Sequence, residues 1–150
     1  MALFEKITED IKAAMLAKES IKLEALRGIK KEFLEAKTAK GNENGELSDE
    51  TAIKILSKMV KQRKESAEIF ASQNRADLAE RELAEAGFIV AYLPKQMDEA
   101  ELTVIIKEII AQVGAVNMQD LGKVMGVASK QLAGKADGKL ISQIVKHLLQ

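Results

Sequence analysis

The sequence predicts an all-α protein, and three features of its 150 residues support that prediction. Apolar residues recur every three or four positions along almost the whole chain, which is the period of one face of an α-helix, and no segment shows the strict alternation of a β-strand. Only one proline, Pro94, interrupts these patterns. Because aromatic residues make up only 3% of the chain, the core is expected to consist of aliphatic side chains and methionine, as in small helical bundles.

Four helices are expected before Pro94, arranged as a helical bundle or a pair of hairpins. Ser20 and Ser48 are expected to cap the second and third helices, because a serine oxygen accepts hydrogen bonds from the free N–H groups of a first helical turn. The third helix continues without glycine or proline to about Gln73, and Asn74 is expected to open the fourth. The apolar stripes of the first two helices predict the following core residues: Leu3, Phe4, Ile7, Ile11, Ala14, Met15, Leu23, Leu26, Ile29, Phe33 and Leu34.

A domain boundary is expected at Pro94, because proline disfavours the helical conformation in the residue before it. Shortly after it, Asp98 and Glu101 have the spacing of a capping box, in which two side chains bond free N–H groups at the start of a helix. We therefore predict two domains, an N-terminal helical domain over residues 1–93 and a small helical domain over residues 94–150.

Three shorter helices are expected in the second domain. Their predicted extents are about residues 99–113, 118–132 and 138–149. Gly114 is expected to end the first of them, because glycine readily adopts the left-handed conformation that closes a helix. Asn117 and Asp137 have the side chains that cap the second and the third.

Composition excludes several classes of function. The chain has no cysteine, which excludes disulfides, thiolate metal sites and cysteine nucleophiles. No stretch approaches the ~18 uninterrupted apolar residues of a membrane span, and the stretch MALFEKITEDIKAAM lacks the apolar run of a secretory signal. We therefore expect a cytoplasmic protein without a membrane partner.

Net charge gives a mixed indication about nucleic acid. The 23 basic and 23 acidic residues balance, which argues against a purely electrostatic binder of nucleic acid. Residues 118–150, however, hold five lysines and only two aspartates, a net charge of +3. Any basic surface is therefore expected near the C-terminal end of the sequence.

The segment LGKVMGVASKQLAGKADGKL combines glycine and lysine within a helical pattern. At 100° per residue, Gly122, Gly126 and Ser129 form a strip of small residues on one flank of the predicted helix, where another backbone can approach closely. Lys123 and Lys130 fall opposite the predicted core face. The approaching backbone belongs to a neighbouring helix in one interpretation and to a ligand in the other.

The last predicted helix presents a second pair of lysines. Lys139 and Lys146 share one face, which carries donors and no carboxylate. The opposite face is expected to be buried and consists of Leu140, Ile141, Ile144, Val145 and Leu148.

The connection between these two helices also has two interpretations. Lys135 lies there between Gly134 and Gly138, and the free N–H groups of a helix N-terminus at this point can meet a phosphate. In the structural interpretation, Gly134 stops one helix and Asp137 caps the next.

No combination of residues predicts catalysis, a metal site or a cofactor site. His147 is the only histidine and has no serine, aspartate or metal-ligand pattern near it in the sequence. A phosphate-binding loop of the Walker type is not present around Gly138, because Leu140 stands where serine or threonine is required.

A basic cluster on the third predicted helix has a simple explanation. Lys61 and Lys64 precede Glu65 and Glu68 by four residues, so ion pairs along the helix surface account for this cluster more simply than contact with nucleic acid does.

The segments LRGIKKEFLEAK (residues 26–37), YLPKQMDEAEL (92–102) and GKVMGVASKQLAGKADGKLISQIVKHLL (122–149) together resemble the YqeY family. The resemblance spans essentially the whole chain. It implies that the first 93 residues form a helical bundle particular to this family. It also implies that residues 95–150 are similar to the tail domain of the B subunit of the glutamyl/aspartyl-tRNA amidotransferase, a small helical domain that contacts transfer RNA.

The catalytic domain of that subunit has no counterpart in this chain. The carbon–nitrogen ligase activity associated with the family, with glutamine as amide donor, is therefore expected to belong to the larger subunit. The resemblance makes two groups of residues candidates for RNA binding. The candidates for phosphate contact are Lys123, Lys130, Lys135, Lys139 and Lys146, and those for close approach of an RNA backbone are Gly122, Gly126, Gly134 and Gly138.

We predict a non-catalytic accessory protein that binds transfer RNA or another structured RNA and uses no cofactor or metal. The alternative is a protein–protein adaptor that docks onto the amidotransferase or another translation component, with the Gly122, Gly126 and Ser129 strip receiving a partner helix. A carbon–nitrogen ligase is the third hypothesis.

Overall fold

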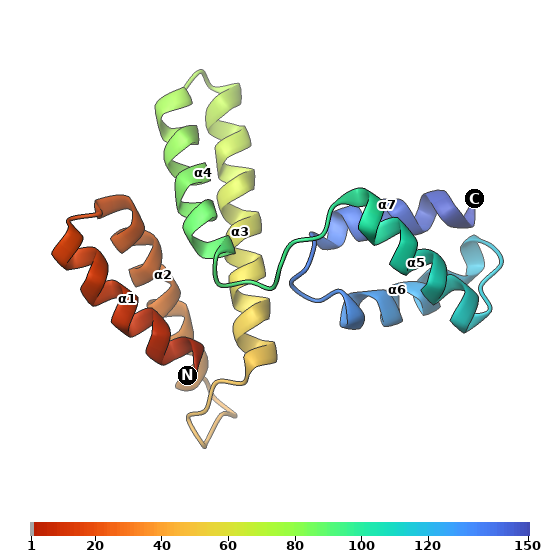
Figure 1. The fold of residues 1–150 in the computed structure, drawn as a ribbon, viewed down its shortest axis with the longest axis horizontal. Coiled ribbons are helices and arrows are strands. Elements are labelled where there is room, and N and C mark those ends of the chain that lie inside the picture. Colours follow the sequence, from red (N-terminus) through yellow and green to blue (C-terminus); the bar gives the residue numbers. More distant parts are fainter. Residues whose placement is uncertain (1) are drawn as a thin grey trace. The chain divides into compact units, whose positions relative to one another are not determined.

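The computed structural model describes residues 2–150, which consist of helices and connecting turns (Figure 1). This part of the chain contains no β-strand, so the predicted all-α class is confirmed. No helix in it has the length and hydrophobicity needed to cross a membrane. The elements are α1 (Leu3–Ala17), α2 (Ser20–Lys37), α3 (Asp49–Ser72), α4 (Ala76–Val90), α5 (Glu99–Val113), the short 3₁₀ turn η1 (Met118–Asp120), α6 (Leu121–Gln131) and α7 (Gly138–Leu149).

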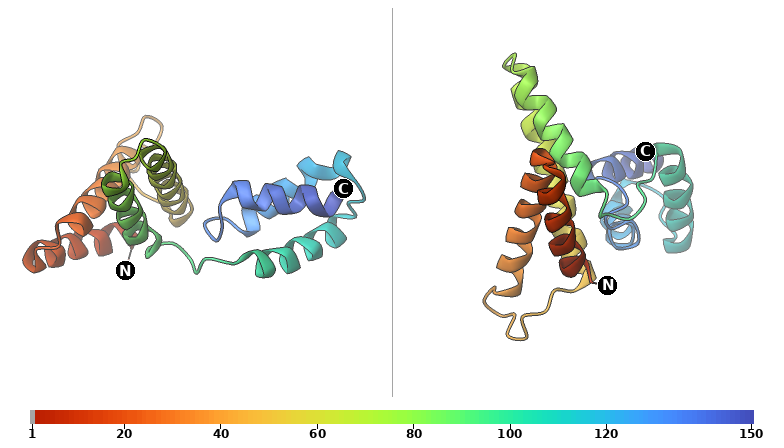
Figure 2. Two further views of the ribbon diagram at one scale, coloured as in Figure 1. Left: turned by 90° about the horizontal axis from the view of Figure 1, so that it is seen from above. Right: turned by 60° about the vertical axis from the view of Figure 1, so that its left-hand side comes forward.

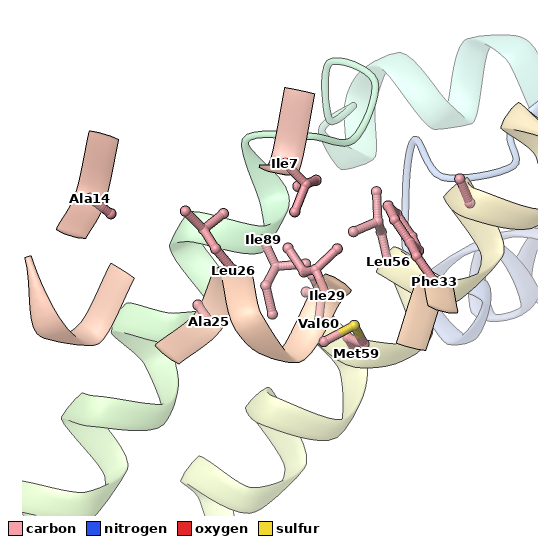
Figure 3. Packing of buried hydrophobic residues seen from close by; sticks show 11 residues of the cluster. Ile7, Ala14, Ala25, Leu26, Ile29, Phe33, Leu56, Met59, Val60 and Ile89 are labelled. Atoms are coloured by element: carbon pink, nitrogen blue, oxygen red, sulfur yellow. The ribbon is translucent and has the colours of Figure 1, made fainter. Parts of the chain in front are cut away.

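The chain divides at its proline into two compact units, Met1–Leu93 and Pro94–Gln150. In the first unit, α1 packs against α2 and α3 against α4, and α2 also packs against α4. Figure 3 shows the side chains of α1, α2, α3 and α4 that meet in its core. Burying one large aliphatic or phenylalanine side chain contributes about 1.5–3 kcal/mol, and the fully buried ones here are Ile7, Leu26, Ile29, Phe33, Leu56 and Ile89.

One of the three predicted caps in the first unit is confirmed and two are wrong. Ser48 Oγ accepts a hydrogen bond from the Thr51 N–H at 3.1 Å, as expected. Ser20 is instead the first residue of α2, and Glu19 before it makes no side-chain capping bond. Asn74 has a φ of 60°, a left-handed conformation that asparagine tolerates, and it belongs to the turn between α3 and α4.

Two predicted core residues of the first unit are exposed to solvent. Met15 is 53% exposed and Leu34 is 43% exposed. Each directly follows a buried residue, Ala14 or Phe33, and therefore lies 100° further around its helix. A helix that is covered on one side buries only a narrow stripe, and these two side chains fall outside it.

Arg63 joins α3 to α4 through two carboxylates. Its Nη1 atom lies 3.2 Å from Glu82 Oε2 and 3.3 Å from Glu85 Oε2. Glu85 is the only charged side chain that is buried in residues 2–150. Burial raises the pKa of its carboxyl group, while the positive charge of Arg63 acts in the opposite direction. The ion pair thus links two helices through a group that is costly to bury alone.

The ion pairs expected along α3 are absent from the described chain. No pair at 4 Å or less joins Lys61 to Glu65 or Lys64 to Glu68. Exposed pairs of this kind gain little, because ordering two long side chains offsets most of their attraction.

Tyr92 connects the end of the first unit to α1. Its hydroxyl donates a hydrogen bond to Asp10 Oδ2, and Lys6 Nζ lies 5.5 Å from the centre of its ring. Burial, together with the Asp10 carboxylate, raises the pKa of the phenol. Side-chain contacts therefore hold the chain in place shortly before the boundary at Pro94.

The second unit contains three helices, each of which packs against the other two (Figure 2). Its core is aliphatic and takes residues from all three: Leu102, Ile106, Ile109, Val124, Ala128, Leu132, Ile141, Ile144, Val145 and Leu149. Leu149 was not among the residues expected to be buried, and Leu140 and Leu148 are only half-buried.

The residues predicted to cap or end these helices do so, but of the two bonds of the predicted capping box only the one to the Asp98 side chain is present in the described chain. Asp98 Oδ1 accepts a hydrogen bond from the Glu101 N–H at 2.8 Å. Asn117 Oδ1 accepts one from the Gln119 N–H at 3.0 Å. Gly114 has a φ of 69° and ends α5 in the left-handed conformation. One detail differs, because the helix predicted after Asn117 begins as η1 and becomes α-helical only in α6.

We expect Arg63→Met to lower the free energy of unfolding of the first unit by about 2 kcal/mol, because the buried Glu85 carboxylate loses its main charged partner. Tyr92 is the only tyrosine and the chain has no tryptophan, so tyrosine fluorescence during urea unfolding reports on this unit. Lys64→Met on the same helix is the matched control, and a loss of equal size there would contradict this role of Arg63.

The raised pKa of Glu85 predicts a pH dependence of stability. An unfolded glutamate titrates near 4.5, and the folded chain retains the Glu85 proton to a higher pH. The contribution of this group to stability is therefore present at acid pH and is lost as the pH rises through its folded pKa. Glutamine does not titrate, so Glu85→Gln should not lose this stability. The free energy of unfolding of the variant should therefore increase relative to that of the wild type as the pH rises. Urea midpoints measured between about pH 4 and pH 7 would check this, and a relative loss by the variant would contradict it.

Candidate nucleic-acid interface

The charges of the second unit are distributed unevenly among its helices. α5 carries three glutamates and one lysine, whereas α6 and α7 carry lysines and no carboxylate. The two aspartates next to them already accept backbone hydrogen bonds: Asp120 Oδ2 from the Val116 N–H at 2.9 Å, and Asp137 Oδ1 from the Lys139 N–H at 3.0 Å. Within the described chain, no lysine of residues 94–150 forms an ion pair. The lysines of α6 and α7 are thus available to an anionic partner.

A shallow depression lies on the solvent side of α6. It is lined by Gly122, Lys123, Gly126, Val127, Lys130 and Gln131. A Cβ atom built on Gly122 or Gly126 would have no atom of the described chain within 4 Å beyond its own neighbours and helix backbone. Packing against another helix of the unit therefore does not explain these glycines.

Lys123 and Lys130 lie at either end of this depression. They are seven residues apart, which places them about 10.5 Å apart along the helix axis and within about 20° of each other around it. Both are exposed. The opposite face of α6 contributes Val124 and Ala128 to the core, so burial of that face determines the outward direction of the lysines.

The turn between α6 and α7 brings together the remaining glycines and Lys135. Gly134 has a φ of 74°, the left-handed conformation that favours glycine. Of the two interpretations of this turn, the structure shows the cap: the Asp137 carboxylate accepts a hydrogen bond from the Lys139 N–H at the start of α7. Gly138 is exposed, with open space beside its Cα atom. A carboxylate in this position repels an incoming phosphate, so this helix N-terminus is not a free anion site.

Lys139 and Lys146 form the second pair of exposed lysines, on α7. Their spacing of seven residues again places both on one face, about two helical turns apart. Lys135 is half-buried in the turn between the two lysine pairs. The candidate lysines therefore lie on two helix faces and on the turn that connects them.

The segment before α5 is held against this turn by hydrogen bonds to Gly134 and Lys135, which the sequence did not predict. Gln96 Nε2 donates hydrogen bonds to Pro94 O at 2.9 Å and to Gly134 O at 2.7 Å. The Met97 N–H donates to Lys135 O at 2.9 Å. The partners are separated by 38 residues, so no short-range pattern indicates these contacts.

The exposed side chains of this candidate interface are of the kind that can contact anions. Lysine ammonium groups and backbone N–H groups contact phosphate oxygens without reading the base sequence. Within residues 2–150, no three histidine, aspartate or glutamate side chains gather as a group that could hold a metal ion.

We expect Gly126→Ala to raise the free energy of unfolding of the second unit by up to about 1 kcal/mol, because alanine has the higher helix propensity and meets no atom at this site. Hydrogen exchange of the α6 amides would measure the change. Ser129→Ala, on the same strip, provides a control of smaller expected effect. A loss of stability in Gly126→Ala would show that the glycine serves internal packing.

Comparison with known proteins identifies relatives along the whole chain. The sequence profile of a family described as Yqey-like protein matches residues 4–149. Altered inheritance of mitochondria protein 41, mitochondrial, from Clavispora lusitaniae is 37% identical over 85% of this chain and 81% of that protein. The protein of the same name from Meyerozyma guilliermondii is 42% identical over 61% of this chain and 47% of that protein. The chain thus spans about half the length of this second relative.

One relative has a name that refers to transfer RNA. It is a glutamyl-tRNA(Gln) amidotransferase subunit from Methanobrevibacter smithii, which is 26% identical over 98% of this chain. The match corresponds to only 23% of that protein. The activity of the whole amidotransferase protein therefore cannot be transferred from this match.

The expected cytoplasmic location is contradicted by four relatives, the two fungal proteins above and two more of the same name, which that name describes as mitochondrial. The expectation was based on the absence of a membrane span and of a secretory signal. Neither absence distinguishes the cytoplasm from the interior of an organelle, because transit peptides are amphipathic and lack the long apolar run of a secretory signal.

Proposed function

Because the chain belongs to the Yqey-like protein family, we propose that it is a non-catalytic accessory protein that binds transfer RNA through the lysines of α6, α7 and the turn between them. The observation that supports this proposal is the charge distribution of the second unit. Lysines without ion-pair partners project from two helix faces that carry no carboxylate, and each of the two nearby aspartates accepts a backbone hydrogen bond. The amidotransferase relative adds support, since its name refers to transfer RNA.

The proposed binding mode relies on phosphate contacts. All five aromatic residues belong to the first unit: Phe4, Phe33, Phe70, Phe88 and Tyr92. The second unit therefore has no phenylalanine, tyrosine or tryptophan on which an unpaired base can stack, a contact worth about 1–3 kcal/mol per base elsewhere. Recognition would then depend on the shape and charge of a folded RNA backbone.

The exposed glycines fit this mode. A side chain at Gly122 or Gly126 would occupy the depression between Lys123 and Lys130. Its absence allows a sugar–phosphate strand to lie close to the α6 backbone while both ammonium groups reach phosphate oxygens. On this view the glycines are retained despite a cost of about 1 kcal/mol each in helix propensity.

The second candidate function is a protein–protein adaptor, and exposed apolar residues favour it. Val127 borders the depression on α6 and is 36% exposed, while Val116 and Met118 before α6 are 80% and 40% exposed. A partner helix seated on α6 would cover Val127. The lysines would then contribute much less than the apolar contacts.

The test is a titration of the full-length protein into end-labelled bulk transfer RNA, followed by fluorescence anisotropy at several salt concentrations. We expect binding that weakens steeply with salt, and a loss of at least tenfold in affinity for Lys135→Glu/Lys139→Glu. The slope of log affinity against log salt should fall by about one for each lost lysine–phosphate contact. Lys58→Glu/Lys61→Glu on α3 is the matched control, with the same change in charge.

Two results would refute RNA binding by this surface. One is the absence of wild-type binding even at low salt. The other is an equal loss in the control pair, which would attribute the effect to net charge alone. Either result would direct attention to the adaptor function.

A further inference from the structure

The segment before α5 contributes to the surface that carries the α6–α7 turn. The Gln96 side-chain amide has two N–H groups, and both are used: one bonds Pro94 O at 2.9 Å and the other Gly134 O at 2.7 Å. One residue later, the Met97 N–H bonds Lys135 O at 2.9 Å. Two successive residues of the segment are thus attached to two successive carbonyl groups of the turn.

This attachment places Lys95 beside the turn. Lys95 precedes Gln96 directly, and two residues of chain span at most about 7 Å, so its backbone lies within that distance of the Met97 position. Its side chain is exposed and forms no ion pair within the described chain. The sequence separates Lys95 from Lys135 by 40 positions, but the fold brings the two to the same loop cluster.

Two aspartates stand within three positions of Lys95 or Lys135 in the sequence, and each accepts a backbone hydrogen bond. Asp98 Oδ1 accepts the Glu101 N–H at 2.8 Å as the cap of α5. Asp137 Oδ1 accepts the Lys139 N–H at 3.0 Å as the cap of α7. Lys95 therefore adds a positive charge next to Lys135 without a carboxylate that pairs with it.

We infer that Lys95 is a further phosphate-contacting residue of the RNA surface and that Gln96 is a positioning residue, which holds Lys95 beside the turn. The inference rests on the proposed function, because the anion is taken to be the RNA backbone. It extends the surface beyond α6 and α7 to the segment that precedes α5.

The first test compares Lys95→Glu with Lys107→Glu in the full-length protein, by anisotropy with end-labelled bulk transfer RNA. Both lysines are exposed residues of the second unit, and both variants change the charge by two units. Lys107 lies nine residues beyond the cap of α5 and therefore about 13 Å along that helix. We expect at least a fivefold loss of affinity in Lys95→Glu and less than a twofold loss in Lys107→Glu.

The second test addresses Gln96 with Gln96→Met, which keeps the length and charge of the side chain and removes both N–H donors. We expect a weakening of about threefold. The double variant Gln96→Met/Lys95→Glu should bind about as tightly as Lys95→Glu alone. Gln96 acts through Lys95, and in both variants that lysine is absent. A purely structural role of Gln96 would instead give additive losses.

The outcomes separate this inference from the function on which it rests. If the wild-type protein binds no transfer RNA at low salt, both are refuted. If it binds and Lys135→Glu/Lys139→Glu weakens binding, but Lys95→Glu behaves like Lys107→Glu, only the role of Lys95 is refuted. Additive losses in the double variant refute the positioning role of Gln96. Far-UV circular dichroism of each variant checks that the helices remain formed.

Discussion

Burial of one aliphatic face on each of three short helices is the constraint on which the second unit depends. Helices of 11 to 15 residues such as α5, α6 and α7 are marginal on their own in water. α6 also contains two exposed glycines, which lower its intrinsic helix stability further. Its formation therefore depends on the core, to which it contributes Val124 and Ala128.

The same burial determines where the lysines point. Rotation of α6 or α7 about its axis would expose the core residues, so the packing allows only one orientation of each helix. Lys123 and Lys130 must then face solvent on α6, and Lys139 and Lys146 must do so on α7. The candidate RNA surface is thus the outer side of a core, and it needs no loop closure to form. The backbone of a surface preorganised in this way loses little conformational entropy on binding.

Helix capping also bears on the local charge of the candidate RNA surface. Aspartates at the helix ends accept backbone hydrogen bonds, as Asp120 and Asp137 do, and within the described chain neither forms an ion pair with a lysine. A chain with a net charge of zero can therefore present a locally basic surface. The first unit differs, because its carboxylates do form ion pairs, some of which join helices, as between Arg63 and Glu85.

Features that depend on residues up to about four positions apart could be predicted from the sequence. The helical class, most helix limits and the caps at Ser48, Asp98, Asn117 and Asp137 are of this kind, because a cap and its N–H partner are neighbours in the chain. The lysines and glycines of the candidate surface were also visible as a pattern of residues. The exposure of Lys123 and Lys130 on one side of α6 followed from helical periodicity.

Contacts between residues that are distant in the sequence, and the exposure of individual side chains, are known only from the tertiary structure. It shows that the glycines of α6 meet no neighbouring helix and that Met15 and Leu34 lie outside the buried stripe. It also reveals the bond between Gln96 and Gly134, whose partners are 38 residues apart. Such contacts depend on how whole helices pack, and packing is set by the summed burial of many side chains. No local sequence signal specifies that sum, so these features could be found only in the folded chain.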